Sequence, residues 1–260
     1  MMARGPLWYQ AFEARPDARV RLYCLPCAGG GASTYRPWMP FVPDWVELRA
    51  VRLPGRQARH REPAFEDCET AAQAVAEWLS AEEGPYALFG HSMGAMLAYR
   101  ATRILQAEGA ALPALLAAAS WPVHGVPHVT MPDPDDDDDA FCAKAAGLAG
   151  PATDLLDDPD VRALVLPVMR ADFRLCRSYV YREEAPLPVP VSVFGGDDDP
   201  VTPAETLSDW KEHGEPVLGP RLFRGGHFFL QEHVGDLTAA VMTDLADVLG
   251  SSPGGRRAVG

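Results

Sequence analysis

The segment that most constrains the fold is residues 86–99, where an apolar run leads into Gly-x-Ser-x-Gly and continues as an alanine-rich helical pattern. A strand, a sharp turn and a helix in this order form a nucleophile elbow, whose turn lifts Ser92 out of the backbone. Gly90 and Gly94 fit this geometry because a strained turn leaves no room for a Cβ atom at either flank. The simpler alternative is a serine that only caps a helix. The strand-like residues before the motif and the helix-forming residues after it favour a reactive Ser92.

The composition favours a single α/β domain over residues 1–260. Hydrophobic residues make up 47% of the chain, which is enough for a sizeable core. The net charge of −13 argues against nucleic acid or an anionic membrane as a partner. No apolar stretch has the length of a membrane span, and the first residues lack the pattern of a secretion signal. We expect a cytoplasmic protein that acts as a monomer.

The five cysteines show no disulfide framework. Cys24 and Cys27 form a CxxC pair, but no second pair of ligands follows, and Cys24 lies in an apolar strand. The five aspartates at 135–139 lack the spaced ligands and turn glycine of a cation site, so they predict a solvated loop. We therefore expect no metal and no redox centre.

Strand and helix patterns alternate along the chain. Strands are predicted at 19–25, 45–53, 86–91, 112–120, 189–194 and 217–223. A helix is predicted at 68–81, capped by Asp67, and others at 203–213 and from 230 to about 249. This alternation predicts a mostly parallel sheet with helices on both faces.

The alternation is interrupted at about 127–185, where two helical patterns replace strands. In the second, Leu164, Val168 and Leu175 share one face. This position favours a helical lid, although ordinary core packing explains the apolar stripe equally well. Residues 251–260 are expected to form a frayed tail.

The order of polar residues predicts a Ser-Asp-His relay. A serine hydroxyl is a weak nucleophile and needs an imidazole base whose tautomer is fixed by a carboxylate. His227 is the candidate base because it lies on a glycine-rich loop after the last strand, whereas His91 is expected to point away from the elbow. The candidate acids are consecutive: Asp197, Asp198 and Asp199. This chain order is that of the α/β-hydrolase fold.

The glycine-rich turn after the first strand is the candidate for half of an oxyanion hole. Its Ala28 N–H and the N–H of Met93, the residue after the nucleophile, would hold the oxyanion. The turn lacks the lysine of a phosphate-binding P-loop.

Five arginines fall between Arg49 and Arg61 in an otherwise acidic chain. This reversal of charge predicts a docking patch for an anionic partner, with Arg52, Arg56 and Arg59 as its candidates. The alternative is a loop whose arginines pair with neighbouring carboxylates. A second candidate patch is formed by Arg170, Arg174 and Arg177.

Five blocks of the chain resemble the type II thioesterases that accompany modular polyketide and nonribosomal peptide synthases. They follow the family's order and are residues 25–30, 53–56, 89–94, 194–199 and 225–230. The resemblance implies a serine thioester hydrolase that removes aberrant or stalled acyl groups from the phosphopantetheine arm of acyl or peptidyl carrier domains. It implies no cofactor of the enzyme itself, because the phosphopantetheine belongs to the substrate. It also implies a lid at the insertion.

The resemblance assigns roles to single residues. The triad acid of the family's Gly-x-x-Asp block falls on Asp199. The other site positions fall on Ser92, His227, Ala28 and Met93. Two departures matter: Cys27 stands where the family often has an imidazole or phenol, and the segment after Asp199 is one residue shorter than usual. The second departure keeps Asp198 as an alternative acid.

The leading hypothesis is therefore a stand-alone editing thioesterase of polyketide, nonribosomal peptide and antibiotic biosynthesis. Two alternatives belong to other classes. One is a serine carboxylesterase for small soluble esters, and the other is a catalytically silent hydrolase fold that binds a partner.

Overall fold

The strands assemble into one mixed sheet. The computed structural model describes residues 7–127, 131–147 and 158–251, and within them seven strands lie in the order β1-β3-β2-β4-β5-β6-β7. The pair β1 and β3 is antiparallel, and every other neighbouring pair is parallel. The strands are β1 (Tyr9–Ala11), β2 (Val20–Leu25), β3 (Val46–Val51), β4 (Tyr86–His91), β5 (Leu116–Ala119), β6 (Val191–Gly196) and β7 (Val217–Phe223). The predicted mostly parallel sheet is confirmed. Strand β1 was not predicted, because its three half-buried residues are too few to show a period.

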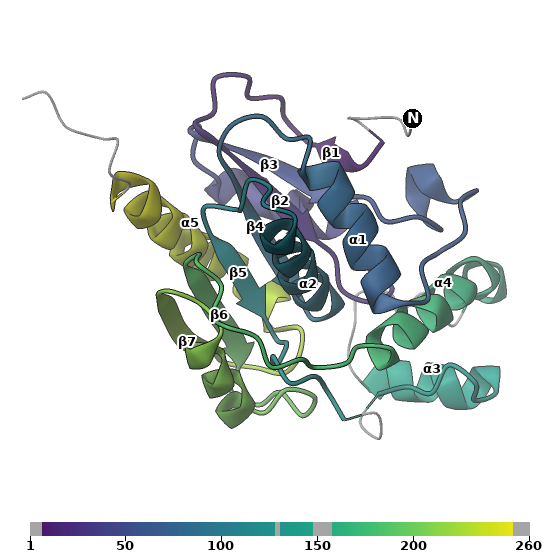
Figure 1. Ribbon diagram of the computed structural model, residues 1–260. Coiled ribbons are helices and arrows are strands. Elements are labelled where there is room, and N and C mark those ends of the chain that lie inside the picture. The colour runs from purple at the N-terminus through teal and green to yellow at the C-terminus, as the bar shows by residue number, and fades with distance from the viewer. Residues whose placement is uncertain (1–6, 128–130, 148–157, 252–260) are drawn as a thin grey trace, which may run out of the picture.

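Helices cover both faces of the sheet, as predicted. On one face pack α1 (Cys68–Leu79) and α2 (Met93–Ala107), and on the other α5 (Val234–Ser251) lies with the 3₁₀ segment η1 (Ala32–Phe41) (Figure 1). Each face has its own apolar core: Leu88 of β4 is buried on the α2 side and Phe89 on the α5 side. Because successive strand residues point to opposite faces, a strand covered on both sides is apolar throughout.

Local signals explain where α1 begins and why the segment η1 is a 3₁₀ helix. Asp67 Oδ1 accepts a hydrogen bond from the Thr70 N–H at 2.8 Å, which caps α1 as predicted. In η1, Pro37 and Pro40 each remove a backbone donor. The helix predicted at 203–213 is the 3₁₀ segment η5 (Ala204–Glu212). Two short 3₁₀ segments are η2 (Gln57–Arg59) and η6 (Phe229–Gln231).

The insertion between β5 and β6 contains α3 (Asp138–Gly147) and α4 (Pro159–Arg177), which lie beside each other at one end of the sheet (Figure 1). Both helices were predicted. Leu164, expected on the packed face of α4 with Leu175, is instead 77% exposed and borders an open cavity. Residues 128–130 and 148–157, and the predicted tail after residue 251, lie outside the described residues. In the described part of the chain, no helix is both long and apolar enough to cross a bilayer.

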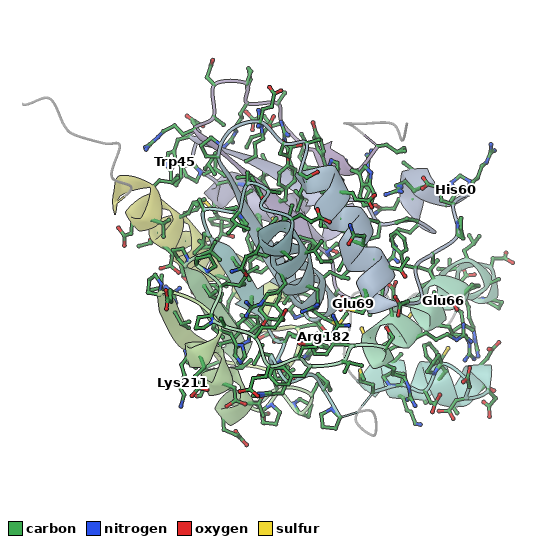
Figure 2. The ribbon with its side chains drawn as sticks, in the orientation of Figure 1. Trp45, His60, Glu66, Glu69, Arg182 and Lys211 are labelled. Atoms are coloured by element: carbon green, nitrogen blue, oxygen red, sulfur yellow. The ribbon has the colours of Figure 1, made fainter. Side chains whose placement is uncertain are left out.

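The acidic run at 135–139 is exposed, as predicted, but its charge is balanced by α4. Arg170 Nη2 lies 2.7 Å from Asp138 Oδ1. Arg174 lies between this run and Glu66, 3.2 Å from the Glu66 carboxylate, and Figure 2 shows Glu66 next to α4. The arginines of α4 are therefore engaged inside the chain, and the prediction that they form a docking patch is not supported.

Candidate active site

The turn between β4 and α2 has the strained geometry of a nucleophile elbow. Ser92 has φ 53° and ψ −120°, a combination that non-glycine residues rarely adopt. A Cβ atom on Gly94 would lie 2.2 Å from the Leu25 carbonyl oxygen, and one on Gly90 would lie 2.2 Å from the Gly94 carbonyl oxygen. Both flanks therefore require glycine, for the reason that the motif predicts.

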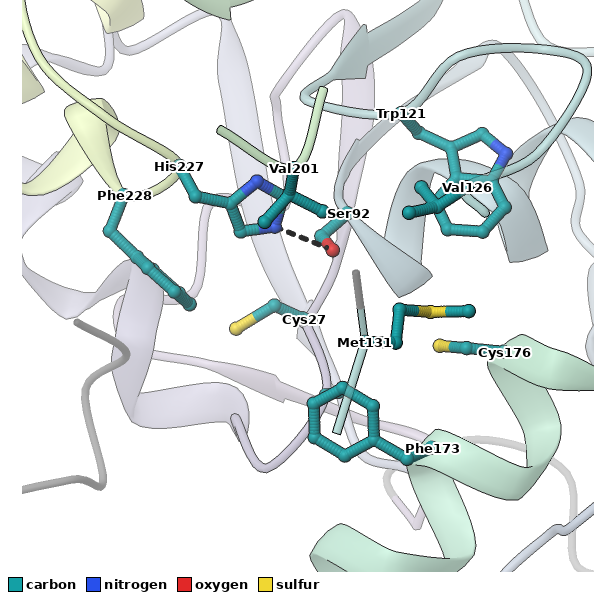
Figure 3. A pocket seen from close by; sticks show the side chains of 11 residues that line it. Cys27, Ser92, Trp121, Val126, Met131, Phe173, Cys176, Val201, His227 and Phe228 are labelled. Carbon is teal, nitrogen blue, oxygen red and sulfur yellow. Dashed lines mark hydrogen bonds between the residues drawn. The ribbon is translucent and has the colours of Figure 1, made fainter. Parts of the chain in front are cut away.

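Three side chains from distant parts of the sequence form a hydrogen-bonded chain. His227 Nε2 lies 2.9 Å from Ser92 Oγ, and Figure 3 shows this contact. On the other side of the ring, His227 Nδ1 lies 2.8 Å from Asp199 Oδ2. An ionised carboxylate only accepts hydrogen bonds, so Nδ1–H donates to Asp199 and Nε2 is left to accept the serine proton. Asp198, the alternative acid, is exposed and does not contact the ring in the described structure.

The loops after β6 and β7 bring the acid and the base together. Asp199 Oδ1 accepts from the N–H groups of Val201 and Thr202 at 2.8 and 3.0 Å, and its Oδ2 also accepts from the Thr202 hydroxyl. Burial alone would raise the pKa of Asp199, but the hydrogen bond and charge of His227, together with the Thr202 bonds, lower it to about 2. The carboxylate therefore stays ionised at neutral pH while fully buried.

His91 was expected to point away from the elbow, but its ring lies against the loop that carries the base, a contact that the sequence reasoning missed. Its Nε2 lies 2.7 Å from the backbone carbonyl oxygen of His227. Burial, with a smaller contribution from the charge of His227, lowers the pKa of His91 to about 3, so the ring is neutral and Nε2–H donates. The available signal was its position beside Ser92 at the end of β4, which faces the loop after β7.

The two expected oxyanion donors belong to different segments of the chain. Met93 is the first residue of α2, and Ala28 lies in the turn that follows β2. Ala28 and Ser92 line the same cavity. Their roles as oxyanion donors stay a prediction.

The cavity at Ser92 is narrow and mostly apolar. It measures about 40 Å³, room for only a few water molecules. Figure 3 shows Phe173 and Cys176 of α4 facing it from below the serine. Burial and the charge of Asp172 raise the pKa of the Cys27 thiol to about 12, so this thiol is neutral and is no second nucleophile.

The docking prediction is wrong for Arg56 and Arg59. The two side chains are only 8% and 6% exposed. Arg59 holds both carboxylate oxygens of Glu62, at 2.9 and 2.6 Å, and lies 4.2 Å from the centre of the Trp8 ring. Arg52 is half-buried. The alternative interpretation, a loop whose arginines pair with neighbouring carboxylates, describes this region better. The number of arginines in a segment does not show which carboxylates the fold brings beside them.

The five cysteines are free thiols. Among residues 7–127, 131–147 and 158–251, no group of three or more His, Cys, Asp or Glu side chains is placed to hold a metal ion.

A mostly parallel sheet with a serine elbow, an acid after β6 and a histidine after β7 defines the α/β-hydrolase fold. The predicted fold class is confirmed. A family model described as "Thioesterase domain" matches residues 20–245, and the chain belongs to this family of hydrolases.

Individual proteins similar to this chain are thioesterases as well. Thioesterase PikA5 of Streptomyces venezuelae is 35% identical over 235 residues, which is 87% of this chain and 81% of that protein. The type II thioesterase BorB from the borrelidin biosynthetic cluster superimposes with a TM-score of 0.82 at 31% identity, over 94% of this chain and all of that one. YbtT, a type II thioesterase from the yersiniabactin NRPS/PKS pathway, does so with a TM-score of 0.79 at 25% identity, over 91% and 97% of the two chains. The resemblance to type II thioesterases is confirmed.

Proposed function

We propose that this chain hydrolyses aberrant or stalled acyl groups from the phosphopantetheine arm of acyl or peptidyl carrier domains, as a stand-alone enzyme. The observation that carries the proposal is the hydrogen-bonded chain of Ser92, His227 and Asp199 in a member of the thioesterase family. The pathway assignments of BorB and YbtT support a place in the biosynthesis of polyketides and nonribosomal peptides.

In the proposed reaction, Ser92 Oγ attacks the thioester carbonyl carbon while its proton passes to His227 Nε2, and Asp199 stabilises the imidazolium that forms. The tetrahedral oxygen takes up negative charge and accepts hydrogen bonds from the N–H groups of Ala28 and Met93. The C–S bond then breaks. Because a thiol has a reference pKa near 8.5, the departing sulfur depends less on protonation than an amine would. His227 gives its proton to the departing thiolate and is then free to act as a base again. Water attacks the acyl-enzyme while its proton passes to His227, and His227 returns that proton to Ser92 Oγ as the ester bond breaks and the acid is released.

This chemistry uses only groups of the chain and of the substrate. We propose that the phosphopantetheine is substrate, not cofactor, and that no metal takes part. The buried free cysteines fit a reducing compartment, which supports a cytoplasmic location. A monomer is the simplest proposal, because all three members of the relay come from one chain.

The acyl group would lie against the apolar wall of the cavity, formed by Trp121, Val126 and Phe173. The present volume of about 40 Å³ leaves little room for a long acyl chain. Since α4 supplies Phe173, we propose that the insertion is a lid and that a displacement of α4 opens the site.

The test is hydrolysis of acyl groups from a phosphopantetheinylated carrier domain, followed by mass spectrometry. We expect release by the wild-type chain and none above background by Ser92→Ala. Loading the carrier with acyl groups of two to ten carbons would map the cavity. Equal release by the two proteins would overturn the proposal.

The same protein samples separate the alternatives. A carboxylesterase would cleave p-nitrophenyl or glyceryl esters far faster than the carrier-bound thioester. A silent binding protein would leave Ser92 unlabelled by a fluorophosphonate probe. We expect labelling of the wild-type chain, with His227→Ala as the control that removes it.

A further inference from the structure

A buried carboxylate of the insertion contacts the loop that follows β2. Asp172, on α4, is only 1% exposed. Its Oδ1 accepts from Arg56 Nη2 at 2.6 Å, and its Oδ2 accepts from Arg56 Nη1 at 2.7 Å. The same Oδ2 accepts from the backbone N–H of Gly29 at 2.8 Å. Asp172 therefore joins three segments that are far apart in sequence: α4, the arginine loop and the turn at Gly29.

Gly29 directly follows Ala28, the expected oxyanion donor. The turn is held at several points: Gly29 has φ 70°, the Gly30 N–H donates to the Cys27 carbonyl oxygen at 3.0 Å, and Arg56 Nη1 donates to the Gly30 carbonyl oxygen at 3.1 Å. The Gly29 N–H itself is held by Asp172, which lies outside this turn. The peptide planes on both sides of Ala28 are thereby fixed in direction.

An ion pair of this kind is poorly explained by stability alone. Taking the charges of Arg56 and Asp172 out of water costs free energy, and apolar side chains of similar volume often serve the fold as well or better. Oxyanion stabilisation, by contrast, depends on donors held in place before the reaction begins. An acceptor fixed on Gly29 N–H supplies such a constraint next to the donor at Ala28.

We infer that Asp172 is a positioning residue of the reaction: through Gly29 it fixes the Ala28 N–H toward the tetrahedral oxygen, and Arg56 holds the carboxylate in place. The inference rests on the proposed function. It makes the insertion a part of the oxyanion hole as well as a cover: after any displacement that admits the acyl group, α4 must lie against the turn again when the tetrahedral oxygen forms.

Two double variants distinguish a positioning role of Asp172 in the reaction from a purely structural role. In Arg56→Met with Asp172→Asn, the charges are gone, but the asparagine oxygen still accepts from Gly29. In Arg56→Met with Asp172→Leu, the branched shape of the side chain is kept and the acceptor is lost. We expect both to fold, with unfolding temperatures close to each other. The leucine variant should lose roughly 10- to 100-fold in kcat for a carrier-bound thioester relative to the asparagine variant, with KM within about threefold.

A second measurement reports on the oxyanion itself. An alkyl boronic acid forms a tetrahedral adduct with a reactive serine, and one of its oxygens would occupy the position of the oxyanion. Its affinity should fall in the leucine variant by about the same factor as kcat. Equal kcat and equal boronate affinity in the two variants would overturn the positioning role and leave Asp172 with a structural role only.

Failure of the positioning role can be told apart from failure of the proposed function. If the wild-type chain releases acyl groups and Ser92→Ala does not, the proposed function stands, whichever way the two double variants compare. If the wild-type chain releases none, the proposed function fails in the first assay, and the positioning role fails with it.

Discussion

His91 donates a hydrogen bond from Nε2 to the backbone carbonyl oxygen of His227, across 2.7 Å. The two rings lie 5.2 Å apart between centroids and come from opposite sides of the elbow, one from β4 and the other from the loop after β7. The residue beside the nucleophile thus holds the backbone of the base.

Replacing His91 should impair catalysis without removing the nucleophile. In His91→Phe the carbonyl of His227 loses its donor, so the loop after β7 is held less firmly, and we expect kcat to fall roughly 10- to 100-fold with little change in KM. His91→Gln retains an N–H donor of similar reach and should recover most of kcat. Steady-state kinetics with one thioester checks both. Equal activity of the phenylalanine variant and wild type would contradict a positioning role.

The same residue should make the fold sensitive to acid. The pKa of His91 is about 3 in the folded chain, below its ordinary 6.5, so between these values the unfolded chain binds more protons. The free energy of unfolding should therefore fall as pH decreases through this range, with a His91 contribution of about 3 kcal/mol lost by pH 4. Urea unfolding at pH 7 and pH 4 measures it. His91→Gln should show a smaller loss; an identical loss would rule out this origin.

Replacing Asp199 should lower kcat far more than replacing its neighbour Asp198. Asp199→Asn leaves the imidazole without a carboxylate to fix its tautomer and stabilise its charge, and we expect kcat to fall about 10³- to 10⁴-fold. Asp198→Asn alters an exposed side chain and should stay within about threefold of wild type. Single-turnover acyl release compares the two. A larger loss in the Asp198 variant would reassign the acid.

Arg59 should matter for stability rather than for carrier binding. Arg59→Ala removes the contacts with Glu62 and with the Trp8 ring, so we expect a loss of about 2 kcal/mol in unfolding free energy. KM should change in the same proportion for a carrier-bound thioester and for a small one. Arg61→Ala, at an exposed position of the same loop, is the matched control for stability. A rise in KM confined to the carrier substrate in Arg59→Ala would restore the docking role.

The elbow should not tolerate a methyl group at Gly94. The added Cβ would lie 2.2 Å from the Leu25 carbonyl oxygen, a contact that only a backbone shift relieves. We expect Gly94→Ala to lose at least about 3 kcal/mol in unfolding free energy, or to fail to fold. Gly250→Ala in α5, where a Cβ meets nothing within 4 Å, should gain up to about 1 kcal/mol. Circular dichroism during urea unfolding compares them.

The sequence predicted most of the fold because its signals are local. The apolar run before Ser92 marks a strand buried on both faces, and Asp67 marks the start of α1. The elements without such signals were missed or misjudged: β1 is too short to show a period, and η1 contains two prolines that prevent a regular α-helix.

The site divides in the same way. Ser92 and His227 stand in motifs that the chain order makes recognisable, so both could be selected from sequence. The choice of Asp199 over Asp198 needed the family resemblance, because three consecutive aspartates look alike until the loop after β6 turns one of them inward. The contacts of His91 and Asp172 could not be read from sequence, since their partners, the His227 carbonyl oxygen for one and the Gly29 N–H and Arg56 for the other, lie in distant segments.

By itself the sequence determined the order of strands and helices, the nucleophile and the base, because each is encoded within a few neighbouring residues. Only the tertiary structure decided which arginines are buried, which aspartate faces the imidazole, and that a carboxylate of α4 holds the turn beside Ala28. These facts depend on segments far apart in the chain packing together, and the free energy of burying a charge depends on the partner it meets there.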